Sequence, residues 1–249
     1  MFNRRWSRIE PALKSVLDAY DTAVSRPEPT EEDVRVLLET QKNLLYDSTE
    51  LIEDFEKNYR RAVIPTEKLA SSSFALSKGL RNHIVMQCNK MKHNHAYLGF
   101  VSAQFQFVRI LGYSVISYVD SNTMGPNPDV HKQRPAFSFP VELRKVLANI
   151  YILGEEVAAA IRTAVELRTD VPPVSVSEGW AEILTRIQNL PRAVFPSERA
   201  AHMPYFEYTA NVLELEEKGG EIRHERGGSV TKSTYRADGI TRSFRIGEI

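Results

Sequence analysis

Residues 30–59, TEEDVRVLLETQKNLLYDSTELIEDFEKNY, decide the fold of this chain. Apolar and small residues recur along the stretch at the spacing of one helical face, and Glu31, Glu32 and Asp33 follow Thr30 at its start. A threonine side chain accepts free backbone N–H groups of a first helical turn, where the helix dipole also favours negative charge. The stretch therefore predicts a long, one-sided helix that begins after Thr30.

The apolar face of this helix has two interpretations. It is the spine of the protein's own helical bundle, or it binds a protein partner or a second copy of the chain through Thr30–Tyr59. Every bundle needs such a face for its own core, so the sequence favours the spine and leaves self-association as the alternative.

Charge is distributed unevenly around this helix, although the whole chain is neutral. From Glu28 to Glu56 there are ten acids and two bases, a net charge of −8. From Lys68 to Val119 there is no Asp or Glu, and this acid-free segment contains the sequence NKMKHNH at residues 89–95. Three of the six histidines of the chain lie within residues 83–95. The acid-free segment is therefore a local feature and the first place to look for a site.

The other helices are predicted from caps, prolines and apolar spacing. They cover residues 7–25 with Pro11 at an early position, a segment that starts at Pro65, a helix from about Leu80 into residues 89–95, a helix from a Ser138 cap to about Thr169, and a short helix from Ser177 to Pro191.

The periodicity changes over residues 97–119. Ala103, Phe105 and Phe107 alternate with polar residues, and residues 113–119 are rich in β-branched and aromatic side chains. This pattern predicts two strands that form a hairpin, and the competing prediction is one long helix through Val119.

The C-terminal part of the chain has a different character. Three turn signals, Gly219-Gly220, Gly227-Gly228 and Asp238-Gly239, separate short alternating runs between Tyr205 and Ile249. We expect an α+β protein: a mainly helical body with an inserted β-hairpin, followed by a C-terminal antiparallel β-meander. The helical body covers residues 1–195 with the hairpin near 97–119, and the C-terminal sheet covers 204–249, packed on the body or separate from it.

Composition sets the broad class of the protein. Of 249 residues, 42% are hydrophobic and 26% are charged, which is ordinary for a globular protein that builds its own core. The single cysteine, Cys88, excludes an internal disulfide and a cysteine-based zinc site. No apolar run is long enough to cross a bilayer and no secretory signal is found, so a cytoplasmic protein without a membrane partner is expected. Phosphate-binding glycine loops and the Gly-x-Ser-x-Gly elbow are absent, and no cofactor is expected.

The acid-free segment predicts a basic contact surface. Its candidate binding residues are Lys78, Arg81, Lys90, Lys92 and Asn94, joined by Arg134 from a later loop. These side chains would contact the phosphates of RNA or DNA, with nearby aromatic residues for stacking. The alternative is that the acidic helix of residues 30–59 neutralises them inside the bundle.

The histidines suggest catalysis as a second function. His93 and His131 are candidates for an acid–base pair that would cleave RNA without a metal. The spacing of Arg and His that helical ribonucleases of the HEPN class use is absent, and Lys78 and Lys90 precede histidines in its place. A metal site is not expected, because residues two apart on a helix point in different directions.

The sequence thus favours an interaction protein, either a component of a protein complex or a binder of nucleic-acid backbone. The alternative is a metal-independent nuclease that uses His93 and His131. Cys88 lies on an apolar helical stripe with Ile84 and Met91, so a buried structural thiol is expected there.

Overall fold

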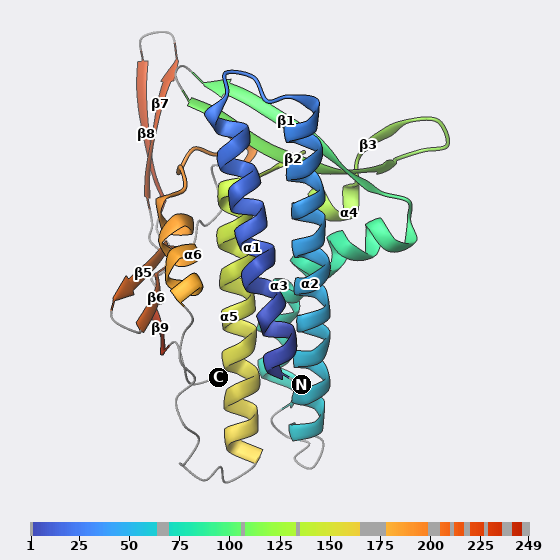
Figure 1. The fold of residues 1–249 in the computed structure, drawn as a ribbon, viewed down its shortest axis with the longest axis vertical. Coiled ribbons are helices and arrows are strands. Elements are labelled where there is room, and N and C mark those ends of the chain that lie inside the picture. Colours follow the sequence, from blue (N-terminus) through green and yellow to red (C-terminus); the bar gives the residue numbers. More distant parts are fainter. Residues whose placement is uncertain are drawn as a thin grey trace.

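The computed structural model describes the backbone of residues 2–63, 70–105, 108–132, 135–164 and 178–198, together with five C-terminal strands. Its helices are α1 (Phe2–Ser25), α2 (Glu31–Val63), α3 (Ala70–His93), α4 (Pro128–His131), α5 (Phe139–Ala164) and α6 (Glu178–Asn189), followed by a 3-10 turn at Pro196–Glu198. Helices α1, α2 and α5 run side by side along the long axis, and a small sheet crosses one end of the bundle (Figure 1).

Helix α2 is the spine of the bundle and contacts α1, α3 and α5. Its inward side chains are at most 2% exposed: Leu37, Leu44, Leu45, Leu51, Ile52 and Phe55. The long helix predicted from residues 30–59 is confirmed. The described apolar side chains of α2 are therefore used within the chain, and self-association through Thr30–Tyr59 stays a prediction.

The start of α2 shows why the helix begins where it does. The Thr30 hydroxyl accepts the Asp33 amide at 3.2 Å, and the Asp33 carboxylate accepts the Thr30 amide at 2.9 Å. This reciprocal arrangement is a capping box, with Asp33 in the place usually held by Glu. Arg26 adds an ion pair to Asp33 at 3.0 Å, which fixes the turn between α1 and α2.

The small sheet contains β1 (Tyr97–Phe105), β2 (Val108–Tyr118), β3 (Met124–Pro126) and β4 (Phe137–Ser138). All pairings are antiparallel, in the order β1-β2-β3, with β4 also pairing with β2. The hairpin predicted over residues 97–119 is confirmed, and the competing long helix is not formed.

One face of this sheet completes the main core. Leu111, Tyr113 and Val115 of β2 are fully buried and pack with the helices. On the opposite, outer face, Phe195 covers the strand at Gly112, where a Cβ atom would lie 2.4 Å from the Phe195 ring. The outer face beyond that point is only partly covered.

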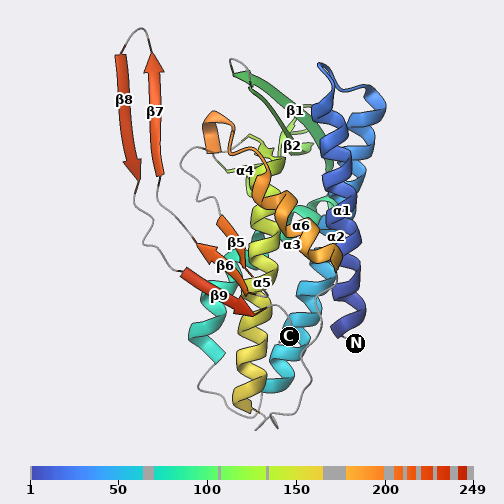
Figure 2. The same ribbon diagram turned by 60° about the vertical axis from the view of Figure 1, so that its left-hand side comes forward.

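The C-terminal strands are β5 (Tyr205–Thr209), β6 (Val212–Glu216), β7 (Gly220–Arg226), β8 (Ser229–Tyr235) and β9 (Thr241–Arg245). They form a three-stranded antiparallel sheet in the order β5-β6-β9 and a separate β7-β8 hairpin, which extends away from that sheet (Figure 2). The α+β class is therefore confirmed. The strands are not one continuous meander, because β9 returns to pair with β6 and leaves the β7-β8 hairpin apart.

The start of one helix differs from the sequence prediction. α1 begins at Phe2, so Pro11 lies inside the helix, where its fixed φ angle suits helical backbone. α3 is one helix from Ala70 to His93, and the start predicted at Pro65 lies outside the described residues. α5 begins directly after Ser138, as predicted, although Ser138 itself belongs to β4. No described helix is both long and apolar enough to span a bilayer.

Candidate functional site

His131, one of the two predicted catalytic residues, is buried beside the central strand β2. Pairing with β3 ends at Ile116, and pairing with β4 begins at Tyr113. Between them, Nε2 of His131 accepts the Val115 amide at 2.7 Å, while the Asn127 amide donates to the Val115 carbonyl at 2.8 Å. The imidazole thus occupies the position in the sheet ladder that β3 and β4 leave open.

The short helix α4 holds this imidazole in place. The Asn127 side chain caps α4 by accepting the amides of its first turn, and its Nδ2 donates to the Ser117 hydroxyl at 2.8 Å. The His131 ring stacks on the Phe137 ring, with centroids 4.5 Å apart. Burial, stacking and the bond to the backbone together give His131 a structural position.

His93 lies in a different environment, exposed at the end of α3. An imidazole nitrogen that already accepts an N–H has no lone pair left to take a proton. Nε2 of His131 therefore cannot act as a base while it accepts the Val115 amide.

The polar segment of residues 89–95 ends α3 and turns the chain into β1. The Lys90 carbonyl accepts the amides of Asn94 at 3.0 Å and Ala96 at 3.3 Å. His95 has a φ of 51°, a left-handed conformation that histidine adopts more readily than most residues. The last turn of α3 also places Lys90, Lys92 and His93 where the helix dipole favours positive charge. Much of this segment is thus explained by the end of a helix.

Two of the predicted phosphate-binding side chains already form ion pairs within the protein. Arg81 pairs with Glu56 of α2. Lys90 pairs with Asp129 at 2.5 Å. These two charges are therefore offset within the protein, Arg81 by the acidic helix and Lys90 by α4.

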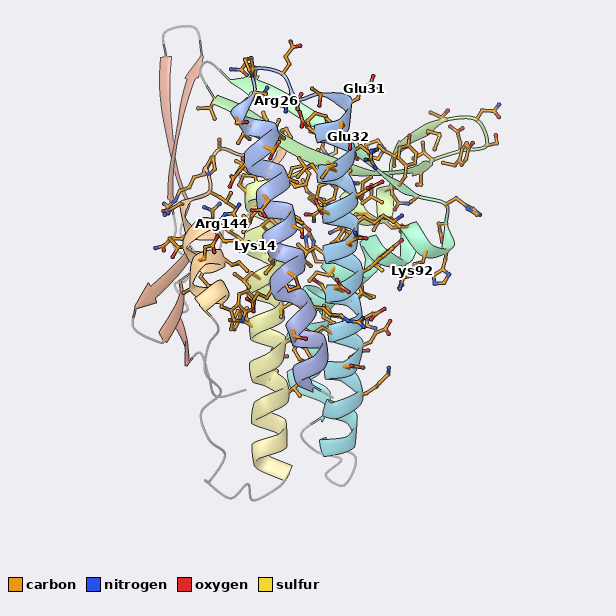
Figure 3. All side chains as sticks on the ribbon, in the orientation of Figure 1. Lys14, Arg26, Glu31, Glu32, Lys92 and Arg144 are labelled. Carbon is orange, nitrogen blue, oxygen red and sulfur yellow. The ribbon has the colours of Figure 1, made fainter. Side chains whose placement is uncertain are left out.

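The remaining predicted binding residues differ in how they are placed. Lys92 is exposed, with its ammonium 5.1 Å from the centre of the Tyr46 ring, and Asn94 is also exposed. Lys78 lies on α3 but its side chain is outside the described residues, as is Arg134. Figure 3 shows Lys92 on the side of the molecule where α3 ends.

A buried polar network lies between α3, α5 and β2. Nε2 of His83 contacts both carboxylate oxygens of Glu142, at 2.8 and 2.9 Å, and Gln87 donates to Glu142 at 2.8 Å. The Tyr113 hydroxyl donates to Gln87 at 2.9 Å and accepts from Gln41 of α2 at 3.3 Å. The network therefore connects three helices to the central strand.

Burial and the neighbouring His83 shift the pKa values of the acidic groups in this network. Burial alone would raise the pKa of Glu142, but the charge and hydrogen bond of His83, with Lys145 and Gln87, lower that pKa to about 2. Burial raises the pKa of Tyr113 well above its ordinary value. Glu142 thus stays ionised in the interior, next to a neutral phenol.

The sequence places His83 in the acid-free segment, but Glu142 was not predicted as a site residue. The one sequence signal for Glu142 is that this acid lies next to the apolar stripe of the predicted helix, one residue before Leu143. Nothing in the spacing of the sequence indicates that α3 and α5 bring His83 and Glu142 together, because they are 59 residues apart.

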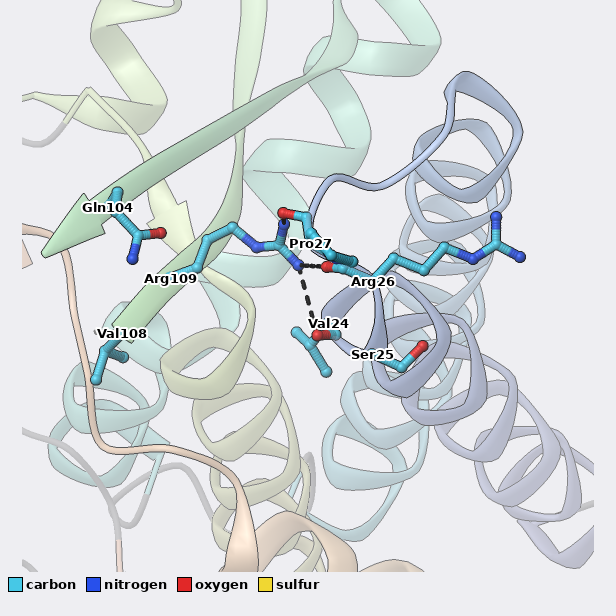
Figure 4. A pocket seen from close by; sticks show the side chains of 7 residues that line it. All are labelled: Val24, Ser25, Arg26, Pro27, Gln104, Val108 and Arg109. Atoms are coloured by element: carbon cyan, nitrogen blue, oxygen red, sulfur yellow. Dashed lines mark hydrogen bonds between the residues drawn. The ribbon is translucent and has the colours of Figure 1, made fainter. Parts of the chain in front are cut away.

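A surface cavity of about 420 Å³ lies between the α1–α2 turn and the hairpin. Arg109 forms one wall, and its guanidinium donates to the carbonyls of Arg26 and Pro27 (Figure 4). It also donates to the Ala23 carbonyl at 3.0 Å. Because Arg109 is engaged with the end of α1, it holds the hairpin to the bundle. The cavity is otherwise lined by Val24, Ser25, Gln104 and Val108.

The outer face of the sheet carries an apolar surface at its other end. The register places Tyr97, Ile116 and Pro126 in one row across three strands, and Tyr118 and Met124 in the next row. Tyr97, Tyr118 and Met124 are 51%, 63% and 43% exposed, whereas most large apolar side chains of the described residues are buried. We call these five residues the sheet-end patch.

Within the described residues, no group of three or more His, Cys, Asp or Glu side chains could hold a metal ion. Cys88 is fully buried, as predicted, and burial raises the pKa of its thiol. No protein-family model, no curated protein and no solved structure matches the chain. Function must therefore be inferred from the chain itself.

Proposed function

We propose that this protein is an interaction protein that binds another protein through the sheet-end patch. The exposed aromatic and apolar rows of this patch carry the proposal. Large exposed apolar patches on a folded protein usually mark binding surfaces, and Tyr and Met are enriched at the centres of protein interfaces. Tyr97 and Tyr118 are the residues expected to contribute most of the binding energy.

Charge beside the patch indicates what the partner carries. The exposed residues Lys92, His93 and His95 immediately precede Tyr97. The acids nearest to the patch along the chain are Asp120, two residues after Tyr118, and Asp129, which is already paired with Lys90. The Asp120 carboxylate accepts the amides of Asn122 and Thr123 in its own turn, which lowers its pKa. A partner segment with apolar residues flanked by Asp or Glu fits these surroundings.

A protein partner is favoured over nucleic acid. Binding to a phosphate backbone needs several free cations, and the salt-dependent affinity grows with their number. Arg81 and Lys90 are already paired with Glu56 and Asp129. Among the predicted phosphate contacts with described side chains, this leaves Lys92 as the exposed cation beside an apolar surface.

The test is a photo-crosslink from the patch. Tyr118 is replaced by p-benzoylphenylalanine, a side chain of similar shape, and the protein is irradiated in extracts of its native host. The control carries the same group at Lys14, which is exposed on α1 and lies away from β3 (Figure 3). We expect a crosslinked peptide, specific to position 118, that combines apolar residues with Asp or Glu.

A second variant tests whether the patch itself binds the partner. With the photo-crosslinker at Tyr97, replacing both Tyr118 and Met124 by Ser should reduce the crosslink about tenfold or more, since central aromatic anchors dominate an interface. A nuclease-sensitive adduct, a peptide without acids, or equal yield from Lys14 would each overturn the proposal.

A further inference from the structure

Strand β1 has an open edge. Among the described strands it pairs with β2 alone, from Tyr97 opposite Ile116 to Phe105 opposite Val108. The pairing is one-to-one over nine residues, so no bulge interrupts it. The backbone N–H and C=O groups on the other side of β1 form a continuous row that another strand can use.

The sequence of this edge lacks the residues that usually protect an edge strand. Natural edge strands carry charged residues, Pro or bulges that prevent pairing with another chain. The sequence of β1, YLGFVSAQF, has neither charge nor Pro, and residues 93–108 contain no Lys, Arg, Asp or Glu. An edge of nine residues without charge or Pro favours pairing with a strand of another chain.

We propose that β1 pairs antiparallel with β1 of a second copy of this chain, centred on Val101. In this register Tyr97 lies opposite Phe105, Gly99 opposite Ala103, and Val101 opposite its own equivalent. Every cross-strand pair is uncharged, so a two-fold arrangement brings no like charges together, and one aromatic pair lies at each end.

The second copy is the occupant that this strand fits best. A symmetric interface needs a surface that is complementary to itself. A neutral strand whose outer face carries Gly99, Val101 and Ala103 between aromatic ends meets that requirement. A two-fold axis perpendicular to the sheet keeps both outer faces on the same side. The dimer would therefore present two sheet-end patches together and strengthen binding to a bivalent partner.

The experiment uses charge at Ser102, which is exposed on β1 and flanks the two-fold axis. Light scattering after size exclusion should give the unmodified protein a mass of twice 28.3 kDa. Ser102→Lys and Ser102→Glu should each shift the protein toward the monomer, because each variant puts a charge on the edge strand and two like charges then lie diagonally across the pair, about 7–8 Å apart. Mixing the two variants should restore the dimer. Ser15→Lys, which adds the same charge on α1, should remain dimeric.

A chemical crosslink tests the register. A short bis-maleimide should link Val101→Cys to its equivalent in the second copy, while Gln104→Cys, roughly 20 Å from its equivalent in this register, should not react. Cys88 is buried and gives the background. A monomeric unmodified protein, or dimers that persist in both Ser102 variants, would overturn the pairing. If the Tyr118 photo-crosslink still captures an acidic partner in that case, the proposed function stands without the dimer.

Discussion

Nε2 of His131 lies 2.7 Å from the backbone nitrogen of Val115 and takes the place of a strand carbonyl. The two residues are 16 positions apart, and the bond joins the short helix α4 to the middle of the sheet. Because the imidazole accepts the Val115 amide, the backbone hydrogen bonds of β2 remain satisfied between the two short strands β3 and β4. His131 therefore contributes to the fold through one atom, the Nε2 that accepts the Val115 amide.

Replacing His131 by Phe separates this bond from the packing of the ring. The phenyl ring of His131→Phe would still pack against Phe137, but it would leave the buried Val115 amide without an acceptor. We expect a loss of about 1–3 kcal/mol in the free energy of unfolding, measured by urea denaturation. His93→Phe, at an exposed position, should change stability by less than about 0.5 kcal/mol. Equal stabilities of the two variants would contradict the ladder role.

Glu142→Gln removes the charge from the buried network. His83 would then lose its carboxylate partner, and losing a hydrogen bond to a charged group costs about 1.5–3 kcal/mol. Glu50→Gln is the matched control, since Glu50 pairs with Arg8 at 3.4 Å on the exposed surface, where such pairs contribute about 1 kcal/mol or less. A similar loss in both variants would show that Glu142 contributes no more than a surface acid.

The same network predicts a pH dependence of stability. The pKa of Glu142 is about 2 in the folded protein, below the ordinary value of 4.5. The stabilisation from this group is therefore present above pH 4.5 and is lost as the pH falls toward 2, because the unfolded chain takes up the proton first. Unfolding curves between these pH values should show this loss, and Glu142→Gln should flatten it. An unchanged slope in the variant would assign the acid sensitivity to other groups.

The elements with strong local signals could be predicted from the sequence, and the site could not. The Thr30 capping box and the apolar face of α2 are local patterns, so helix and boundary were both correct. The hairpin of residues 97–119 was also found, because alternation and β-branching act over a few neighbours. Pro11 misled the prediction, because proline is typical of a first helical turn, whereas α1 begins nine residues earlier and continues through Pro11 without its amide hydrogen bond.

The candidate site depends on contacts between distant parts of the chain. His131 was selected for its chemistry, but its bond to Val115 depends on where β3 stops and β4 starts. Glu142 was missed because its partner His83 comes from another helix. The sheet-end patch depends on the strand register, which brings Tyr97 beside Ile116 and Pro126 and could not be read from residue types alone.

Arg109 should be sensitive to its shape as well as its charge. Its planar guanidinium reaches several carbonyls at the end of α1, whereas the ammonium of Arg109→Lys is a single point of charge. We expect Arg109→Lys to lose about 1–2 kcal/mol of stability in urea denaturation, since most of the hydrogen bonds to a charged donor disappear. Arg8→Lys, on the exposed pair with Glu50, is the control and should change little. If both substitutions have the same small effect, Arg109 does not hold the hairpin to α1.

The two glycines of the hairpin provide a matched pair of substitutions. A Cβ atom at Gly112 would lie 2.2 Å from the Phe137 carbonyl oxygen, a backbone atom that cannot rotate away. At Gly99 the nearest atom is Cγ1 of Ile116 at 2.8 Å, in a side chain that can change its rotamer. We expect Gly112→Ala to lose about 3 kcal/mol or more in the free energy of unfolding and Gly99→Ala to lose about 1 kcal/mol or less. Urea denaturation of both variants checks the difference, and a Gly112→Ala protein as stable as Gly99→Ala would mean that β2 and β4 do not approach as closely as described.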